Sequence, residues 1–203
     1  MSQPFNPLDM DNLAHSIVIR MLETEPTPLD SVPRFTGAGL YAIYYSGGFP
    51  AYAVVSETAV SEGAAAVPLY VGKAVPSGGR RGLDVTAHSS TRALANRIRE
   101  HAGSVRATEN LDIDDFTARW LVVEDIWIPL GESALIRRYR PVWNALLDGF
   151  GNHDPGRGRI AGIRSRWDTL HPGRSWVVKY PERTETAEEI AQDVREYLRA
   201  RAQ

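Results

Sequence analysis

The chain has 203 residues, 43% of them apolar, and a formal net charge of −2 at pH 7. This suffices for one sizeable core, so we expect a single domain with appendages. Cysteine is absent, which excludes disulfides, thiol catalysis and cysteine-built zinc sites. The sequence has neither an apolar run near the roughly 20 residues of a membrane span nor the basic-then-apolar start of a secretory signal. We therefore expect a soluble cytoplasmic protein without membrane contact.

The first 35 residues are expected to form a helical extension. Asp9 or Asp11 is suited to begin a helix that runs to about Glu23, because short carboxylates cap helix N-termini. Its apolar stripe repeats every four residues at Leu13, Ile17 and Met21. Prolines at positions 26, 28 and 33 exclude a helix from the linker that follows.

Two short runs, 39–45 and 67–72, are rich in aromatic and β-branched residues and predict the central strands. Because strand side chains alternate, Tyr41, Ile43 and Tyr45 should share one face of the sheet. These strands are expected to carry tyrosines into the interior.

The remaining elements are predicted from composition and spacing. Further strand candidates are 52–55, which leads into a loop over 56–66, then 117–123 and 175–179. Helices are predicted over about 91–102, over about 132–139, and from the capping box of Thr186 with Glu189 to the C-terminus.

The helix over 91–102 directs an Arg and a His towards the sheet. At about 100° per residue, Arg97 and His101 lie on the side of Leu94 and Ile98, whereas Arg99 points outwards. An inward Arg is costly unless an anion meets it. A core acid paired with Arg97 and a backbone carbonyl bonded to His101 would explain why both side chains face inwards without any function. This helix alone therefore does not indicate an active site.

The helix over 132–139 places Glu132 on an apolar stripe with Leu135, Ile136 and Tyr139. An acid in the first turn is equally explained by the helix dipole. Together, however, the two helices bring an Arg, a His and a Glu beside strands that carry tyrosines. A phosphate and Mg²⁺ would neutralise this set, since Mg²⁺ binds a carboxylate, waters and a substrate phosphate.

Five sequence elements now stand in a characteristic order, and the chain resembles the GIY-YIG nuclease superfamily. They are Gly39-Leu40-Tyr41, Tyr70-Val71-Gly72-Lys73, Arg97 with His101, the helix Gly131-Glu132-Ser133-Ala134-Leu135-Ile136, and Asn144. The resemblance covers roughly Gly37–Asn144 and implies an α+β fold with a small three-stranded antiparallel sheet flanked by helices. It divides the single domain into an N-terminal helical extension (1–35), a nuclease core (36–147), and a basic loop with a C-terminal strand and helix (148–203).

The resemblance also implies a role for each matched residue. Tyr41 would orient, and in one version deprotonate, the water that attacks a DNA phosphodiester. A free phenol titrates near 10, so the base role requires Lys73, Arg97 or the metal to favour the phenolate. Tyr70 would hydrogen-bond the scissile phosphate or the water, and Arg97 would stabilise charge developing on the phosphate.

Four further roles follow from the same resemblance. His101 would assist proton movement or hold Tyr41, and Glu132 would bind one divalent metal, Mg²⁺, for which Mn²⁺ could substitute. Asn144 would support the site through hydrogen bonds, and Lys73 would lie close to the phosphate.

Within the superfamily, the chain most resembles type II restriction endonucleases, because nothing suggests the separate DNA-binding domain of homing-type relatives. The run from Asn144 to Gly156 also looks like that branch. This implies a short palindromic, GC-rich double-stranded DNA site (CCGCGG-like), a homodimer with one active site per strand, and a cognate methyltransferase in the host. Long insertions between Tyr41 and Tyr70 and between Gly72 and Arg97 depart from the pattern, but they remove no motif residue.

Arginines in basic loops are candidates for contacts with phosphates or guanine bases. They are Arg80, Arg81, Arg157, Arg159, Arg164 and Arg166. Solvated surface would explain each one singly. Two alternatives stay open for the whole protein: a nicking, repair or homing-type endonuclease of this superfamily, and a DNA-binding protein of the same fold without turnover.

Overall fold

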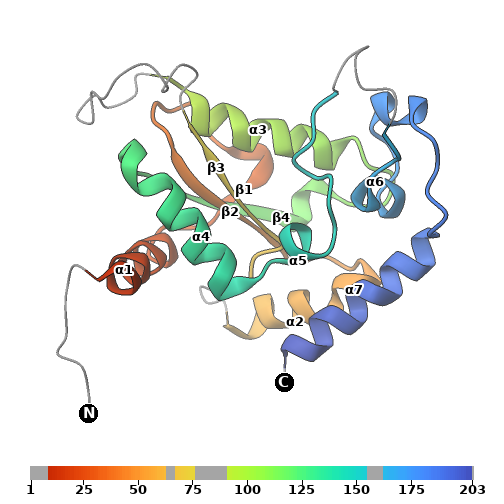
Figure 1. The fold of residues 1–203 in the computed structure, drawn as a ribbon, viewed down its shortest axis with the longest axis horizontal. Coiled ribbons are helices and arrows are strands. Elements are labelled where there is room, and N and C mark those ends of the chain that lie inside the picture. The colour runs from red at the N-terminus through yellow and green to blue at the C-terminus, as the bar shows by residue number, and fades with distance from the viewer. Residues whose placement is uncertain (1–8, 63–66, 76–90, 155–161, 203) are drawn as a thin grey trace.

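The computed structural model describes residues 9–62, 67–75, 91–154 and 162–202 (Figure 1). Within these ranges, four strands form one antiparallel sheet in the order β1-β4-β2-β3. The strands are β1 (Thr27–Pro28), β2 (Gly39–Tyr45), β3 (Tyr70–Ala74) and β4 (Phe116–Val122). The α+β class is confirmed. The predicted three-stranded sheet gains the two-residue β1 at its edge.

Helices surround this sheet. The α-helices are α1 (Met10–Leu22), α2 (Ala53–Glu62), α3 (Ala93–Arg106), α4 (Ile128–Tyr139), α5 (Val142–Ala145), α6 (Arg166–Leu170) and α7 (Ala187–Arg201). Short 3-10 turns connect them at η1 (Leu29–Ser31), η2 (Pro50–Tyr52), η4 (Ile113–Asp115), η5 (Asp125–Trp127) and η7 (Ser175–Lys179). In the described part of the chain, no helix has the length and apolar character that crossing a bilayer requires.

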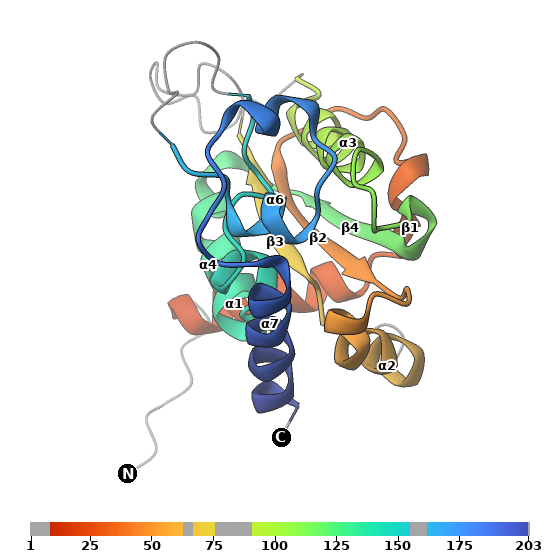
Figure 2. The same ribbon diagram turned by 90° about the vertical axis from the view of Figure 1, so that its right-hand side faces the viewer.

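The central strand β2 is buried along its whole length and divides the interior into two cores. Tyr41, Ile43 and Tyr45 face one core, as the alternation predicts. The residues between them face the other core, where α1 and α4 pack. On the first side α3 packs on the sheet, and buried residues of α6 and α7 extend the same core (Figure 2). The edge strand β3 carries the second of the two tyrosine-containing motifs, Tyr70-Val71-Gly72-Lys73.

Three local predictions are wrong. The segment 52–55 is not a strand: Pro50 opens η2 and α2 follows, so that Tyr52 and Val55 are buried three residues apart with helical spacing. The segment 175–179 forms η7, because the Val177 N–H donates to the Arg174 carbonyl (3.0 Å) and the chain turns.

The third error concerns Glu132. Helix α4 begins at Ile128, four residues earlier than predicted, and Pro129 in its first turn is a signal for that start. Glu132 therefore lies beyond the first turn, which removes the helix dipole as its explanation. The capping box of Thr186 and Glu189 at the start of α7 is confirmed.

Candidate active site

A buried tyrosine–histidine pair lies at the centre of the candidate site. The Tyr41 hydroxyl on β2 is 2.6 Å from Nε2 of His101 on α3, and both side chains are buried. Gly72 on β3 lies opposite Tyr41, and a Cβ at this position would overlap the Tyr41 hydroxyl. The glycine of the second motif is thus needed for this close approach.

Both members of the pair are neutral. Burial, together with the positive charge of Arg97, holds the pKa of His101 well below its usual range. Burial raises the pKa of Tyr41 well above 10, and the Tyr70 phenol adds to this, while Arg97 opposes it. A standing phenolate is therefore disfavoured at Tyr41, and its hydroxyl is an orienting or proton-relaying group.

Tyr70 and Arg97 border this pair. The Tyr70 ring centre is 6.1 Å from that of Tyr41, and 5.2 Å from that of His101. Arg97 donates to the Gly151 carbonyl (2.8 Å), and its ion pair is with Glu100 (3.1 Å), an exposed acid on the same helix. About a quarter of the Arg97 side chain, 23%, is exposed. A core acid therefore does not account for Arg97, which presents part of its guanidinium to solvent.

A lysine and a carboxylate meet on the other side of β3. Nζ of Lys73 is 2.7 Å from Oε2 of Glu132 on α4, and the two side chains are 41% and 22% exposed. Glu132 also lies near the tyrosines: burial is the main cause that raises the pKa of Tyr70, and the charge of Glu132 raises it further. The predicted residues thus converge around the edge strand.

The carboxylate fits one kind of metal site. No group of three or more His, Cys, Asp or Glu able to hold a metal occurs among the described residues. A single part-exposed carboxylate suits Mg²⁺, which commonly keeps several waters and takes its other ligands from a substrate phosphate. Lys73 would have to share or release Glu132 when such an ion binds.

Asn144 holds the strand that carries Tyr70. Its side-chain oxygen accepts from the Val71 N–H and its amide donates to the Val71 carbonyl, both at 2.8 Å. Asn144 thus satisfies the free edge of β3 as a neighbouring strand would. It fixes Tyr70 through the backbone.

This arrangement can be compared with known proteins. A family model described as the Eco29kI GIY-YIG domain matches residues 33–198. The chain belongs to this family. It is a family of type II restriction endonucleases with the GIY-YIG fold, which implies nuclease activity and a DNA substrate. No curated protein matches the chain.

The family match extends beyond the predicted core of 36–147 and includes α6, η7 and most of α7. Part of this additional region belongs to the candidate site of the GIY-YIG domain, because the segment after Asn144 forms one wall of that site. Phe150 stacks on His101 (centroids 4.5 Å apart, planes 18° apart) and Gly151 accepts from Arg97. His153 contacts Arg97 and lies 3.7 Å from Glu100.

The sequence assigned no individual role to Phe150, Gly151 or His153. The only signal was the family-like run between Asn144 and Gly156, because no periodic pattern links residues 54 positions apart, such as Arg97 and Gly151.

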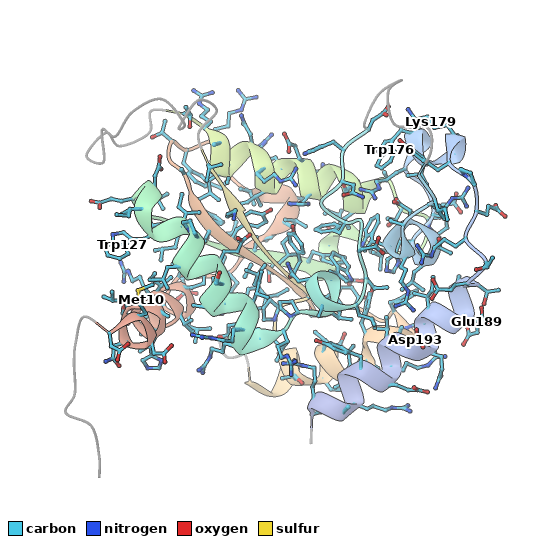
Figure 3. The ribbon with its side chains drawn as sticks, viewed as in Figure 1. Met10, Trp127, Trp176, Lys179, Glu189 and Asp193 are labelled. Atoms are coloured by element: carbon cyan, nitrogen blue, oxygen red, sulfur yellow. The ribbon has the colours of Figure 1, made fainter. Side chains whose placement is uncertain are left out.

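Two of the six arginines predicted to contact DNA lie within the described ranges, and both form ion pairs. Arg164 is 3.4 Å from Glu182, and Arg166 pairs with Glu185 (3.3 Å) and with Asp193 on α7 (Figure 3). Only 13% of the Arg166 side chain is exposed, so in this state it links α6 to α7. Arg80, Arg81, Arg157 and Arg159 lie outside the described residues. DNA contact by these six arginines stays a prediction.

Proposed function

We propose that the protein is a type II restriction endonuclease that hydrolyses both strands of a short palindromic DNA site with the help of one Mg²⁺ ion. The observation that carries this proposal is the convergence of phenols, a guanidinium and a single carboxylate at the edge strand β3. Those groups can bind one phosphate from several sides. The family supports the nuclease class.

The neutral Tyr41–His101 pair suggests how the attacking water is activated. Tyr41 donates its proton to Nε2 of the neutral His101 while its oxygen accepts a proton from the water. No free phenolate forms in this relay, which suits the raised pKa of Tyr41. Because burial and Arg97 hold the pKa of His101 low, it keeps this proton only transiently and returns it, by way of solvent, to the oxygen that leaves when the phosphodiester bond is broken. Groups placed within hydrogen-bonding reach in this way typically act as general acid–base catalysts.

The phosphate would be held by the part-exposed groups around this pair. Arg97 stabilises the charge that develops on the phosphoryl oxygens, and Lys73 lies close enough to contribute. Tyr70 donates its hydroxyl to a phosphate oxygen or to the water. Glu132 would hold the Mg²⁺ ion, which when bound polarises the phosphate and neutralises its charge.

The wider assignment rests on the family resemblance together with these residues. A palindromic, GC-rich target cut on both strands fits a homodimer with one site per strand. A methyltransferase of the same host would protect that target in the cytoplasm. Arg80, Arg81, Arg157 and Arg159 are proposed to contact DNA. Arg164 and Arg166 could do so only by exchanging their acidic partners for phosphates.

The decisive test is digestion of plasmid DNA of known sequence with mapping of the ends, for the wild-type protein and for Glu132→Ala. We expect discrete linear fragments from the wild type in Mg²⁺. Glu132→Ala should still bind DNA but cut several orders of magnitude more slowly, because it lacks the metal-binding carboxylate.

Glu124→Ala is a matched control, since it removes an exposed carboxylate shortly before α4. It should cut at the wild-type rate. If the wild type produced only nicked circles, the activity would be nicking and not restriction. If the wild type bound DNA without cleaving it, the protein would be a non-catalytic DNA-binding protein. Unimpaired cutting by Glu132→Ala would remove this residue from the metal-binding role.

A further inference from the structure

A buried arginine outside the candidate site is held by unusually many contacts. The Arg174 side chain is 3% exposed, and its guanidinium carbon lies 4.6 Å and 4.8 Å from the ring centres of Trp167 and Trp176. Trp176, labelled in Figure 3, belongs to η7. Arg174 Nε donates to Asp168 at 2.6 Å, so its charge is paired in the interior.

The rest of the guanidinium binds one short segment of backbone, 149–152. Its Nη atoms donate to the carbonyls of Gly149 (2.9 Å), Phe150 (3.2 Å) and Asn152 (3.2 Å). A planar fork of five N–H donors is able to fix several acceptors at once. These three hydrogen bonds tie the segment to Arg174.

The same segment touches the candidate active site on its other side. The one carbonyl that Arg174 leaves out, that of Gly151, accepts from Arg97 at 2.8 Å. A Cβ on Gly151 would lie only 3.1 Å from the Tyr70 hydroxyl, and the Phe150 ring stacks on His101. If the segment tilted, the Gly151 carbonyl that accepts from Arg97 and the Phe150 ring that stacks on His101 would move together.

We propose that Arg174 is a positioning residue of the proposed nuclease site, which holds the 149–152 segment so that Gly151 orients Arg97 and Phe150 holds the ring of His101. The proposal rests on the proposed function. Stability alone is a weak reason for this arrangement, because buried ion pairs can often be replaced by apolar residues at little cost. An apolar residue would fill the space between the tryptophans but would not orient three carbonyls.

Two substitutions at Arg174 separate its charge from its geometry. Arg174→Met keeps much of the volume, and Arg174→Lys keeps the charge but lacks the planar fork. We expect both variants to cut DNA about 10²-fold more slowly in single-turnover assays, since small misplacements of catalytic groups cost this much. Binding of target DNA with Ca²⁺ in place of Mg²⁺, and the fraction of folded protein by circular dichroism, are measured in parallel.

A pH profile provides a readout that a purely structural role would not change. Burial is the main cause of the lowered pKa of His101, and the charges of Arg97, His153 and Arg174 lower it further. The neutral phenols of Tyr41 and Tyr70 also face this ring. In Arg174→Met the pKa of His101 should rise, so the acid limb of its pH–rate profile should lie at a higher pH than that of Arg174→Lys, which keeps the positive charge.

Arg183→Met is the matched control. Arg183 is a part-buried arginine of the same C-terminal region (148–203), and it pairs with Glu185 but forms no hydrogen bond to the 149–152 segment. It should cut at the wild-type rate. Trp176→Leu gives a second variant if Arg174→Met does not fold. It removes one face of the cation–π sandwich, so we expect a loss of about tenfold in a folded protein.

The proposal is overturned if Arg174→Lys cuts like the wild type, if the loss merely follows the folded fraction, or if Trp176→Leu has no effect. A wild-type protein that does not cut DNA refutes the proposed function instead. In that case NMR of ¹⁵N-labelled histidine still tests whether Arg174 affects the surroundings of His101. The His101 resonances should shift in the Arg174 variants and not in Arg183→Met, and unshifted resonances would end the proposal.

Discussion

Two buried tyrosine–histidine pairs in the described part of the chain have nearly identical local geometry, and only one of them belongs to the candidate site. Tyr41 is 2.6 Å from Nε2 of His101, and Tyr52 is 2.5 Å from Nε2 of His171. All four side chains are buried, and burial lowers the pKa of both histidines. Bond length and burial therefore do not distinguish a catalytic pair from a structural one.

The surroundings of the two pairs make the distinction. His171 Nδ1 donates to the Asn110 side-chain oxygen (2.9 Å), so its Nε2 accepts from Tyr52, whose oxygen in turn accepts from Trp143 (2.8 Å). Every proton in this chain of bonds is fixed by a neighbour. The Tyr41–His101 pair instead borders a part-exposed guanidinium and, across β3, a carboxylate. A pair beside accessible charges can exchange protons with a substrate, whereas a closed network only holds the fold.

The largest effect that would test this contrast is on catalysis. Tyr41→Phe removes the proton relay while keeping the ring, so the single-turnover cutting rate should fall about 10³-fold, within the usual range for general acid–base groups. A fall of this size corresponds to about 4 kcal/mol of barrier. Rates are measured on DNA that carries the mapped target. A loss of only a few fold would show that Tyr41 is no closer to the chemistry than Tyr52.

The matched substitution in the other pair should affect stability instead. Tyr52→Phe leaves the Trp143 N–H and His171 Nε2 without their partner, and a buried unpaired group costs about 1–3 kcal/mol. We expect the free energy of unfolding to fall by about 2–3 kcal/mol in urea titrations, with the cutting rate of the folded protein unchanged. A large catalytic defect in folded Tyr52→Phe would make both pairs functional and abolish the contrast.

The sequence revealed the first pair and not the second, for a physical reason. Residues four apart on a helix share a face, so Arg97 and His101 could be placed beside the sheet, and strand alternation placed Tyr41 on one face with Ile43 and Tyr45. The resemblance to GIY-YIG nucleases then implied that His101 moves protons or holds Tyr41. Tyr52 in η2 and His171, which follows α6, are 119 residues apart and meet only in the tertiary structure. The position of Tyr52 was also misjudged, because a run with strand-like composition became helical after Pro50.

The wall of the site was hidden for the same reason. The 149–152 segment and Arg174 have no periodicity, and their contacts depend on side chains from α3, α6 and η7 together. The groups proposed to act on the phosphate project from regular elements, so local rules placed them beside the sheet, and the family resemblance supplied their roles. The loop that orients them required the tertiary structure.

The last expected effect is a gradual one, the dependence of stability on pH. Burial lowers the pKa of His171 from 6.5 to about 3. The unfolded chain therefore binds a proton between pH 6.5 and 3 that the folded protein does not bind, so stability falls as the pH falls through this window and is unaffected above it. His171→Gln is neutral at every pH and removes this contribution.

Groups that wild type and His171→Gln share titrate alike in both proteins, so their contributions cancel in the difference between the two free energies of unfolding. We expect the stability advantage of wild type over His171→Gln, measured by urea unfolding at several pH values, to shrink by about 1.4 kcal/mol for each pH unit below about 6. Buried His101 keeps its own contribution in both proteins. A constant difference down to pH 5 would mean that His171 is protonated in the folded state, and the closed network assigned to the second pair would then be wrong.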